Sequence, residues 1–581
     1  MKAMPALCLF IILGLMLTVT QPLAHAQGSL TPPGAPAPTM KTLAQVEPRI
    51  PIDSQPYTIS SKGSYYVTTN LSGVLTISAD QVTLDLMGYT LRSSSGDAIS
   101  IPANQQDLVV KNGIISGSSI GVDARYLRGS NSRFQNLTVS DNSFCGLYIG
   151  SDCLVENCLL ISNGTYGVQS SSAGRLEVRN CRILGSSTDG LVAAGGSRII
   201  GNTIENCGAD GLRLTGSGSI VEENIIKGNA DNYDIAAGNQ LHLIICEIPE
   251  TLDWPCTVSL AGTLTCSVSG TDGLEINSDN VTIDMGGHTL VGSGSTSGYG
   301  IFQPRSYNNL RVSNGKFANW RGTTRGGIYA LGTGTLLSDL QATSNYFGLY
   351  VSKGSTVQNC IAGHSTSHGI ALGTGATASG LLVYSNGANG INSGNGCVLS
   401  ESTSYGNSEN GIEAEDHCSV TRCVAYENDG DGITCVDATI IKECTVYTNA
   451  GYGIRMSDDG LIENCSASWN TEHGIKVYDS CLIRNSVSTH NGAGGYGAGI
   501  WAQGRRNRIE GNQLTFNDDG AFVQGADNFI TRNGASGNSV NWRIDAGNVC
   551  LVVQAAGCGV ITGSSGGTPP GSTDPNANFT Y

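Results

Sequence analysis

The stretch that decides the fold is residues 449–477, NAGYGIRMSDDGLIENCSASWNTEHGIKV, in which Gly453-Ile454 returns as Gly474-Ile475 after 21 residues. The same dipeptide recurs through the second half of the chain as Gly327-Ile328, Gly348-Leu349, Gly369-Ile370, Gly390-Ile391, Gly411-Ile412 and Gly432-Ile433. A repeat this short cannot bury its own apolar residues, so neighbouring repeats must stack on one another. The sequence therefore predicts a solenoid.

Composition excludes a helical repeat. The 581 residues include 79 Gly and 16 Pro, and only 13% are charged, so turn residues outweigh helix formers. The formal net charge is -16 with a pI near 4.9, whereas nucleic-acid binding needs a basic face. We therefore expect no nucleic-acid partner.

Each repeat contains three short strands. The first follows the Gly with alternating inward and outward residues, as in Ile454-Arg455-Met456. A second strand follows, as in Leu461 to Cys465, and a third precedes an Asn-x-x-x-Gly turn such as Asn470 to Gly474. Three strands in a coil of about 21 residues predict an all-β parallel β-helix.

The chain ends and a duplication predict the domain organisation. Residues 1–26 are typical of a cleaved signal peptide, with Lys2, an apolar run and Ala24-His25-Ala26, so we expect a secreted, periplasmic or cell-surface protein. Residues 27–48 predict a Pro/Ala-rich linker and residues 563–581 a disordered tail. No other stretch is apolar enough for a membrane span.

The duplication relates two halves of the solenoid. Residues 80–91 match residues 279–290 at an offset of 199, and residues 228–239 match residues 537–548. The two halves therefore begin with similar segments and end with similar segments. We therefore predict two tandem β-helix domains, residues 49–240 and 241–562, and a monomer.

The chain resembles the right-handed parallel β-helix repeat proteins of the pectin-lyase-like superfamily. The D-x-V-T-[IL]-D-x-x-G-x-T-L segments that begin at Asp80 and Asp279 look like that family's opening coil, and the N-x-x-x-G-I repeats look like its body. The resemblance implies a right-handed solenoid. It also implies polysaccharide lyase, glycoside hydrolase, epimerase, copper-delivery or noncatalytic surface functions. The polygalacturonase motif set is absent, because Ser367-His368-Gly369 lacks its first Gly.

Cysteines and asparagines recur in phase with the repeat. Cys423, Cys444 and Cys465 step by 21 residues, as do Cys397 and Cys418, which predicts ladders of buried thiols or disulfides between coils. Cys256 with Cys266, and Cys550 with Cys558, are the better disulfide candidates. The asparagines Asn157, Asn180, Asn359, Asn464 and Asn485 are interpreted as stacked side chains that satisfy backbone groups at the corners.

The outward residue after each Gly-Ile corner carries the functional signal. Its members are Tyr329, Tyr350, Ala371, Asn392, Glu413, Thr434, Arg455, Lys476, Trp501 and Phe522. Aromatic faces stack on sugar rings and charged groups bond hydroxyls or carboxylates, so we expect a polysaccharide or cell-surface glycan partner. The expected substrate-binding residues are Tyr329, Tyr350, Glu413, Trp501, Arg505, Arg506 and Phe522.

Two reactions fit this row. In β-elimination from a uronic acid, Lys476 or Arg455 would be the base; in hydrolysis, Asp429 and Asp431 or Glu413 would straddle the bond. Glu427, Asp429 and Asp431 also have the oxygen ligands that Ca²⁺ takes, and no other cofactor is indicated. The predicted function is an exported β-helix protein that binds or processes a polysaccharide, with lyase activity on an acidic glycan as the specific hypothesis. The alternative is a noncatalytic structural or adhesive surface protein.

Overall fold

The computed structural model describes residues 47–171, 174–492, 495–554, 560–563 and 575–581. The predicted signal peptide and all but the last two residues of the predicted linker therefore lie outside the described residues. The chain divides into two compact units, residues 1–49 and 50–581, and the second contains all the strands. Among the described residues there is no helix, and hence none long and apolar enough to cross a membrane.

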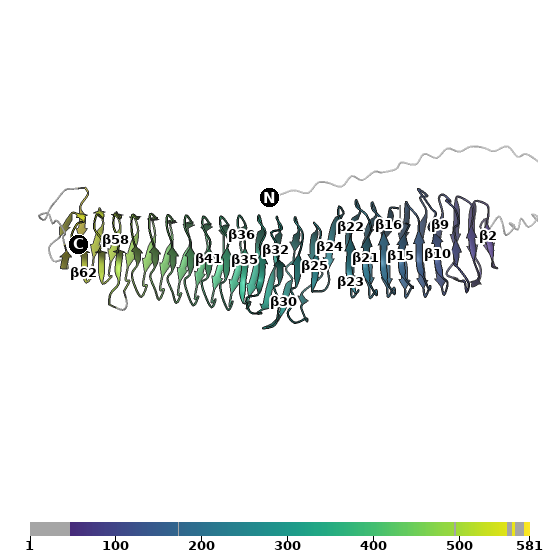
Figure 1. The fold of residues 1–581 in the computed structure, drawn as a ribbon, viewed down its shortest axis with the longest axis horizontal. Coiled ribbons are helices and arrows are strands. Elements are labelled where there is room, and N and C mark those ends of the chain that lie inside the picture. Colours follow the sequence, from purple (N-terminus) through teal and green to yellow (C-terminus); the bar gives the residue numbers. More distant parts are fainter. Residues whose placement is uncertain (1–46, 172–173, 493–494, 555–559, 564–574) are drawn as a thin grey trace, which may run out of the picture. The chain divides into compact units, whose positions relative to one another are not determined.

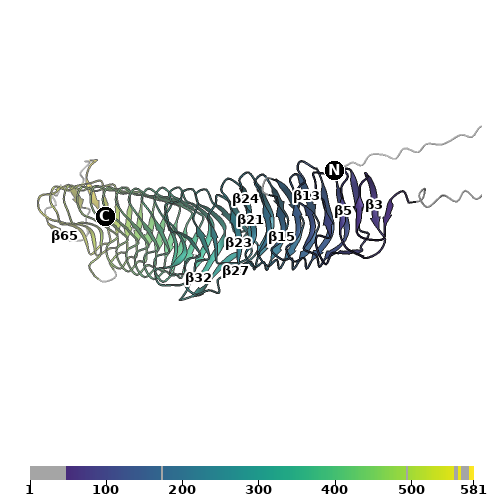
Figure 2. The same cartoon turned by 45° about the vertical axis from the view of Figure 1, so that its right-hand side comes forward.

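The second unit is a parallel β-solenoid, as the sequence predicts. One coil consists of β50 (Ile454–Met456), β51 (Leu461–Glu463) and β52 (Ser466–Ser468). The first strand of the next coil, β53 (Ile475–Val477), pairs with β50 in parallel, Ile454 beside Ile475. The repeat of 21 residues in the sequence is thus the length of one coil. Figures 1 and 2 show successive coils side by side.

The first strands of the coils form two separate parallel sheets. Sheet B contains β2 (Tyr57–Ile59), β5 (Leu75–Ile77), β8 (Ile99–Ser100), β10 (Ile120–Ala124), β12 (Cys145–Ile149), β15 (Tyr166–Ser170), β18 (Asp189–Ala193), β21 (Asp210–Leu214) and β23 (Asp231–Ile235). Sheet C contains β25 (Glu250–Leu252), β28 (Leu274–Ile276), β31 (Ile301–Gln303), β33 (Gly326–Ala330), β35 (Phe347–Val351), β38 (Ile370–Leu372), β41 (Ile391–Ser393), β44 (Ile412–Ala414), β47 (Ile433–Cys435), β50, β53, β56 (Ala498–Ala502), β59 (Asp519–Val523), β62 (Val540–Ile544) and β65 (Val560–Gly563).

The second and third strands of all coils belong to one continuous sheet, sheet A. This sheet crosses the predicted domain boundary, because β22 (Ile220–Lys227) pairs with β24 (Gln240–Ile245) and β24 pairs with β26 (Thr257–Leu260). Sheet B ends at β23, before this boundary, and sheet C begins at β25, after it. We propose that residues 49–240 and 241–562 are two domains that share sheet A.

The inward side chains of each strand make the core. Ile412, Ile433, Ile454 and Ile475 are fully buried and stack in one column. The described cysteines carry free thiols, and Cys397, Cys418, Cys423, Cys444 and Cys465 are buried in the predicted ladders. Cys256 and Cys266, predicted as a disulfide, are also free thiols, and Cys558 lies outside the described residues.

A buried asparagine column closes the corner between sheet A and sheet C. The amide of Asn449 donates to Asn470 Oδ1 at 3.0 Å and to the Ala425 carbonyl at 3.1 Å, and Asn428 donates to Asn449 in turn. This column consists of the Asn-x-x-x-Gly residues. The asparagines predicted to stack have another role, since Asn464 and Asn485 adopt φ of 56° and 53° at the bend between second and third strands.

The end of the chain returns to the solenoid. Residues 563–581 were predicted to be a disordered tail, and residues 564–574 lie outside the described part. Within the rest of this segment, β66 (Asn578–Thr580) pairs with β61 (Gly534–Ser536) and β64 (Val552–Gln554).

Candidate functional site

The outward residues of sheet C form one row along the solenoid. The strand register places them in the order Phe302, Tyr329, Tyr350, Ala371, Asn392, Glu413, Thr434, Arg455, Lys476, Trp501, Phe522 and Arg543. We call this set the outward row. Its order from Tyr329 to Phe522 confirms the register inferred from the Gly-Ile repeat, and the structure adds Phe302 and Arg543 at its ends.

A second row lies beside it, formed by the residue that precedes the Gly of each coil. Its members, the pre-glycine row, include Tyr299, Phe347, His368, Asn389, Asp431, Tyr452, His473 and Asp519. Several of them bond the outward residue of the next coil, 24 positions later: Asn389 donates to Glu413, Asp431 pairs with Arg455 and Asp519 pairs with Arg543. The two rows therefore act as one surface.

Aromatic rings cover the beginning of this surface. Tyr329 stacks on Tyr350 with ring centroids 4.6 Å apart and on Tyr299 at 5.1 Å, and Tyr299 stacks on Phe302 at 4.7 Å. The Arg325 guanidinium lies 4.7 Å from the Tyr299 ring centroid. The rings support one another, so Tyr329 and Tyr350 are held as a half-exposed platform.

The platform ends at a hollow of about 360 Å³. Ala371 occupies the outward row here, and its small side chain leaves room between Tyr350 and Asn392. His368 lines the hollow, and its Nδ1 is buried with no hydrogen-bond partner among the described residues. A buried polar atom without a partner is costly, so a ligand group that bonds His368 would be favoured in this hollow.

Lys476 lies in a box of aromatic rings. Its Nζ is 4.2 Å from the ring centroid of Trp501, 4.8 Å from that of Tyr452 and 5.0 Å from that of Tyr478. It also donates to Tyr452 Oη at 3.4 Å, and only 7% of the residue is exposed. The sequence nominated Lys476 as a catalytic base, but here its ammonium is covered by cation–π contacts.

His473 lies between two of these rings. It stacks on Tyr452 at 5.5 Å and contacts Trp501 at 4.6 Å, and its Nδ1 accepts a hydrogen bond from the Ala498 N–H at 2.8 Å. Burial, and then the Lys476 ammonium, lower the pKa of His473 to about 4. A neutral imidazole that accepts at Nδ1 carries its proton on Nε2, so His473 is a hydrogen-bond donor at neutral pH.

Tyr452 is also held in its protonated form. Burial, and then a hydrogen bond with the Glu472 carboxylate, raise the pKa of Tyr452 well above its ordinary value. The phenol thus remains neutral beside Lys476 and His473. The cluster therefore combines the Lys476 cation, the neutral Tyr452 phenol and His473 imidazole, and the exposed Glu472 carboxylate.

Arg455 and Asp431 form an ion pair within the surface. Arg455 Nε lies 3.0 Å from Asp431 Oδ2, which also accepts from Thr434 Oγ1 at 2.8 Å. The other oxygen, Oδ1, accepts from the Tyr452 N–H at 2.8 Å. Both oxygens of Asp431 are therefore occupied, whereas the Arg455 side chain is 40% exposed.

The structure does not gather the predicted carboxylates. Glu427 and Asp429 are exposed in the turn, whereas Asp431 is buried under Arg455. Over the described residues, no group of three or more His, Cys, Asp or Glu side chains is placed to hold a metal ion. The predicted Ca²⁺ ligands are thus not assembled, and Asp429 and Asp431 do not form an acid–base pair.

The basic residues near the C-terminal end are spread over different faces. Trp501 and Phe522 remain in the outward row, with ring centroids 5.9 Å apart. Arg505 and Arg506 are exposed in the turn after β56, where the Arg505 N–H bonds Asp479.

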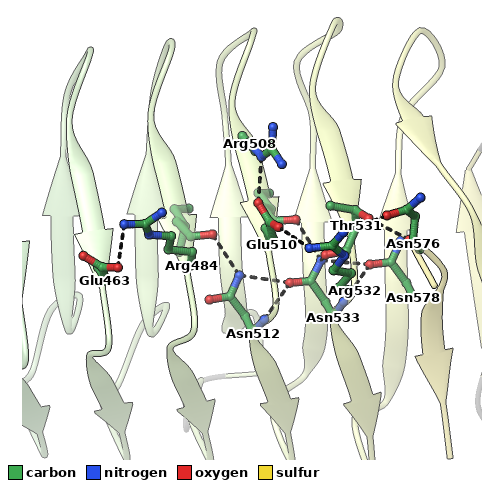
Figure 3. Close-up of polar contacts among 12 residues, drawn as sticks. Glu463, Arg484, Arg508, Glu510, Asn512, Thr531, Arg532, Asn533, Asn576 and Asn578 are labelled. Atoms are coloured by element: carbon green, nitrogen blue, oxygen red, sulfur yellow. Dashed lines mark hydrogen bonds and ion pairs between the residues drawn. The ribbon is translucent and has the colours of Figure 1, made fainter.

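Two further arginines lie on sheet A instead. Arg484 pairs with Glu463 at 2.6 Å and Arg508 pairs with Glu510 at 2.7 Å (Figure 3). The same figure shows a different line of asparagines, at the corner between second and third strands, in which Asn512 bonds Asn533 and Asn533 bonds Asn578. The positive charges of Arg484 and Arg508 are therefore balanced by neighbouring glutamates.

Comparison with protein families identifies the fold family. A model described as "Right handed beta helix region" matches residues 66–199, 166–248 and 373–514, more than half of the chain. The chain belongs to the right-handed β-helix family. The resemblance to right-handed parallel β-helix repeat proteins is confirmed. No curated protein matches this β-helix protein.

Solved structures similar to this β-helix protein include two modules from Azotobacter vinelandii. The mannuronan C-5 epimerase AlgE6 A-module is 14% identical with a TM-score of 0.38, covering 54% of this chain and 91% of that chain. The AlgE4 A-module is 13% identical with a TM-score of 0.30, covering 55% and 90%. The PL6 family alginate lyase AlyGC is 10% identical with a TM-score of 0.27, covering 89% and 97%. Similarity at this level concerns the fold alone.

The pre-glycine row is the part of the site that sequence reasoning missed. Tyr452 and His473 are not among the candidate residues inferred from the sequence, yet they contact Lys476 and Trp501. The signal that could have found them is the interval of 24 residues, which joins Asp431 to Arg455 and Tyr452 to Lys476. It equals one coil of 21 residues plus the offset of three positions from a pre-glycine residue to the outward residue of the same coil.

The state of His473 gives a pH prediction. The pKa of His473 in the folded protein, about 4, lies below its ordinary value of 6.5, so the unfolded chain takes up the proton first. The stability that the neutral form contributes is present above pH 6.5 and is lost as the pH falls toward 4. His473→Gln retains an acceptor for Ala498, and we expect it to reduce the fall of the melting temperature across this window. His242→Gln, at an exposed histidine, serves as the control, and an unchanged pH profile in His473→Gln would contradict the assignment.

Proposed function

We propose that this β-helix protein is exported and binds an extended polysaccharide along the outward row of sheet C. The observation that carries the proposal is the sequence of features on one surface: the Tyr329–Tyr350 platform, then the hollow at Ala371, then the Arg455 and Lys476 cations. With coils about 4.8 Å apart, the seven steps from Tyr329 to Lys476 span about 34 Å. Such a length accommodates a polymer rather than a single sugar.

The chemistry of the surface supports an acidic glycan at the C-terminal end. The partly exposed Arg455 guanidinium and the Nε2–H of His473 are donors suited to a uronate carboxylate or a sulfate. At the other end, the tyrosine rings suit the apolar faces of sugar rings. We infer that the polymer carries both exposed ring faces and negative groups.

The same contacts favour binding over catalysis. A lyase needs a group that removes the proton next to the carboxylate, and Lys476, the candidate from the sequence, is enclosed by three rings. Asp431, the hydrolytic candidate, is bonded through both oxygens. A noncatalytic adhesive or structural β-helix protein is therefore the second candidate. Ultraviolet detection of unsaturated uronates after incubation with alginate or pectate distinguishes a lyase from either noncatalytic protein.

The binding proposal predicts the effect of removing the platform. We expect Tyr329→Ala/Tyr350→Ala to weaken binding to a uronate-containing or sulfated polysaccharide about tenfold, corresponding to about 1.4 kcal/mol of lost ring contact. Affinity electrophoresis in gels that contain alginate, pectate or a sulfated glycan measures the change.

The matched control is Tyr126→Ala, which removes a tyrosine that is 53% exposed on another part of the solenoid. If every glycan in the gel retards the double variant as strongly as it retards the wild type, the platform is excluded as the binding surface.

A further inference from the structure

A row of aromatic side chains runs over seven consecutive coils on sheet A, away from the outward row. It consists of Tyr384, Tyr405, Tyr426, Tyr447, Trp469, His490 and Phe516, which we call the aromatic strip. Each lies at or just after the end of a third strand: β40 (Leu382–Tyr384), β43 (Thr403–Tyr405), β46 (Val424–Tyr426), β49 (Thr445–Tyr447), β52, β55 (Val487–Thr489) or β58 (Gln513–Thr515). The buried asparagine column separates it from sheet C.

The strip is made of two ring stacks. Tyr405 stacks on Tyr426 at 4.8 Å and Tyr426 on Tyr447 at 4.9 Å, with interplanar angles of 4° and 2°. Trp469 stacks on His490 at 4.2 Å, and His490 stacks on Phe516 at 4.9 Å. Since the rings stack along the solenoid, their edges and polar groups repeat at each coil.

The second stack occupies a backbone position that disfavours large side chains. Trp469, His490 and Phe516 have φ of 57°, 55° and 56°, in the left-handed region. In neighbouring coils the same turn position is Gly406 or Gly537, or one of the polar residues Ser385, Glu427 and Thr448, which also have positive φ. A left-handed non-glycine residue costs about 1–2 kcal/mol, and no burial offsets it fully, because Trp469 is 61% and Phe516 58% exposed.

The strand positions that face outward beside the strip tyrosines are uncharged. The outward residue two positions before each strip tyrosine is Leu382, Thr403, Val424 or Thr445. The phenol hydroxyls of the four strip tyrosines have no hydrogen-bond partner among the described residues, so they are available to a ligand. Glu427 is the one charged residue at the turn position of the coils from Tyr384 to Phe516. In a chain of net charge -16, such a surface does not select its partner by charge.

From this geometry we propose that the aromatic strip binds an uncharged polysaccharide that lies along the solenoid. Phenol hydroxyls, the indole N–H and electropositive ring edges all present hydrogen atoms to the oxygens of a hydroxyl-rich polymer. The six steps of the strip span about 29 Å, which exceeds any single sugar. This surface goes beyond the proposed function of sheet C and does not rest on it.

The test separates the two surfaces by substitution. Trp469→Asn/Phe516→Asn removes two rings and introduces a residue that tolerates the left-handed conformation, so the fold is retained and the melting temperature is unchanged or higher. Tyr405→Thr/Tyr426→Thr removes rings from the other stack. Pull-down with insoluble cellulose, chitin, β-1,3-glucan and starch measures retention of the full-length protein, and Tyr329→Ala/Tyr350→Ala is the control on sheet C.

We expect the wild type and the sheet C control to be retained by at least one of these four polymers, and both strip variants to lose tenfold or more of that retention. Failure of the wild type to bind any of the four, or wild-type retention of both strip variants, overturns the proposal. A dimer of the wild type in sedimentation that the strip variants lose also overturns it, because the strip is then a contact between copies. A lowered melting temperature of Trp469→Asn/Phe516→Asn would assign the rings to packing instead.

Discussion

Ile433→Asp is expected to prevent folding or to lower the free energy of unfolding by several kcal/mol. Ile433 is fully buried, and its strand neighbours in the column are Ile412 and Ile454, so the substitution places a carboxylate among apolar side chains. The loss of the parallel β spectrum, or a large drop in melting temperature followed by circular dichroism, is the measurement.

The matched control is Ile440→Asp, the same substitution in the same coil at a side chain that is 40% exposed. We expect this variant to melt close to the wild type, since its carboxylate remains in water. Wild-type melting of Ile433→Asp itself would mean that the inward and outward positions of sheet C have been exchanged.

Asn449→Leu is expected to cost about 4 kcal/mol of stability, although leucine branches at the same Cγ position. Asn449 Oδ1 accepts from both the backbone N–H and the amide of Asn428, and its own amide donates to Asn470 and to the Ala425 carbonyl. Leucine leaves these buried partners unsatisfied at a corner that water does not reach. Denaturant unfolding measures the difference.

Asn464→Gly is the appropriate control, because Asn464 is exposed and adopts φ of 56°, a conformation that glycine takes without strain. A change within about 0.5 kcal/mol is expected there. If Asn449→Leu is equally mild, the buried asparagine column is not a determinant of stability.

The repeat in the sequence specifies positions along the solenoid well. A constant interval between Gly-Ile pairs places Tyr329 beside Tyr350 and Arg455 beside Lys476, and the strand register agrees. Backbone pairing and burial determine these positions, and both follow from the constant interval between Gly-Ile pairs in the sequence.

Side-chain partners are less accessible from the sequence. Lys476 lies among Tyr452, Tyr478 and Trp501, and this depends on rotamers and on the added residues between Gly474 and Gly499. The asparagines show the same limit: the sequence indicated that some stack, but φ separates Asn464 at the bend from Asn449 in the column. The repeat predicts the position of a residue along the solenoid because the backbone determines it. Whether that residue can act as a catalytic group depends on its individual side-chain contacts, which the repeat does not predict.

Because sheet A is continuous through the regular coils, the solenoid is built from units of equal length that can be exchanged for one another. Between Gly369 and Gly474 every coil has the same length, so removing or inserting one whole coil leaves each remaining residue in phase with its neighbours. Such a change alters the distance between the tyrosine platform and Arg455 by a single coil step while leaving both ends intact. The gain or loss of whole coils can therefore change the length of the proposed polymer-binding surface in discrete increments, without changing the residues at its two ends.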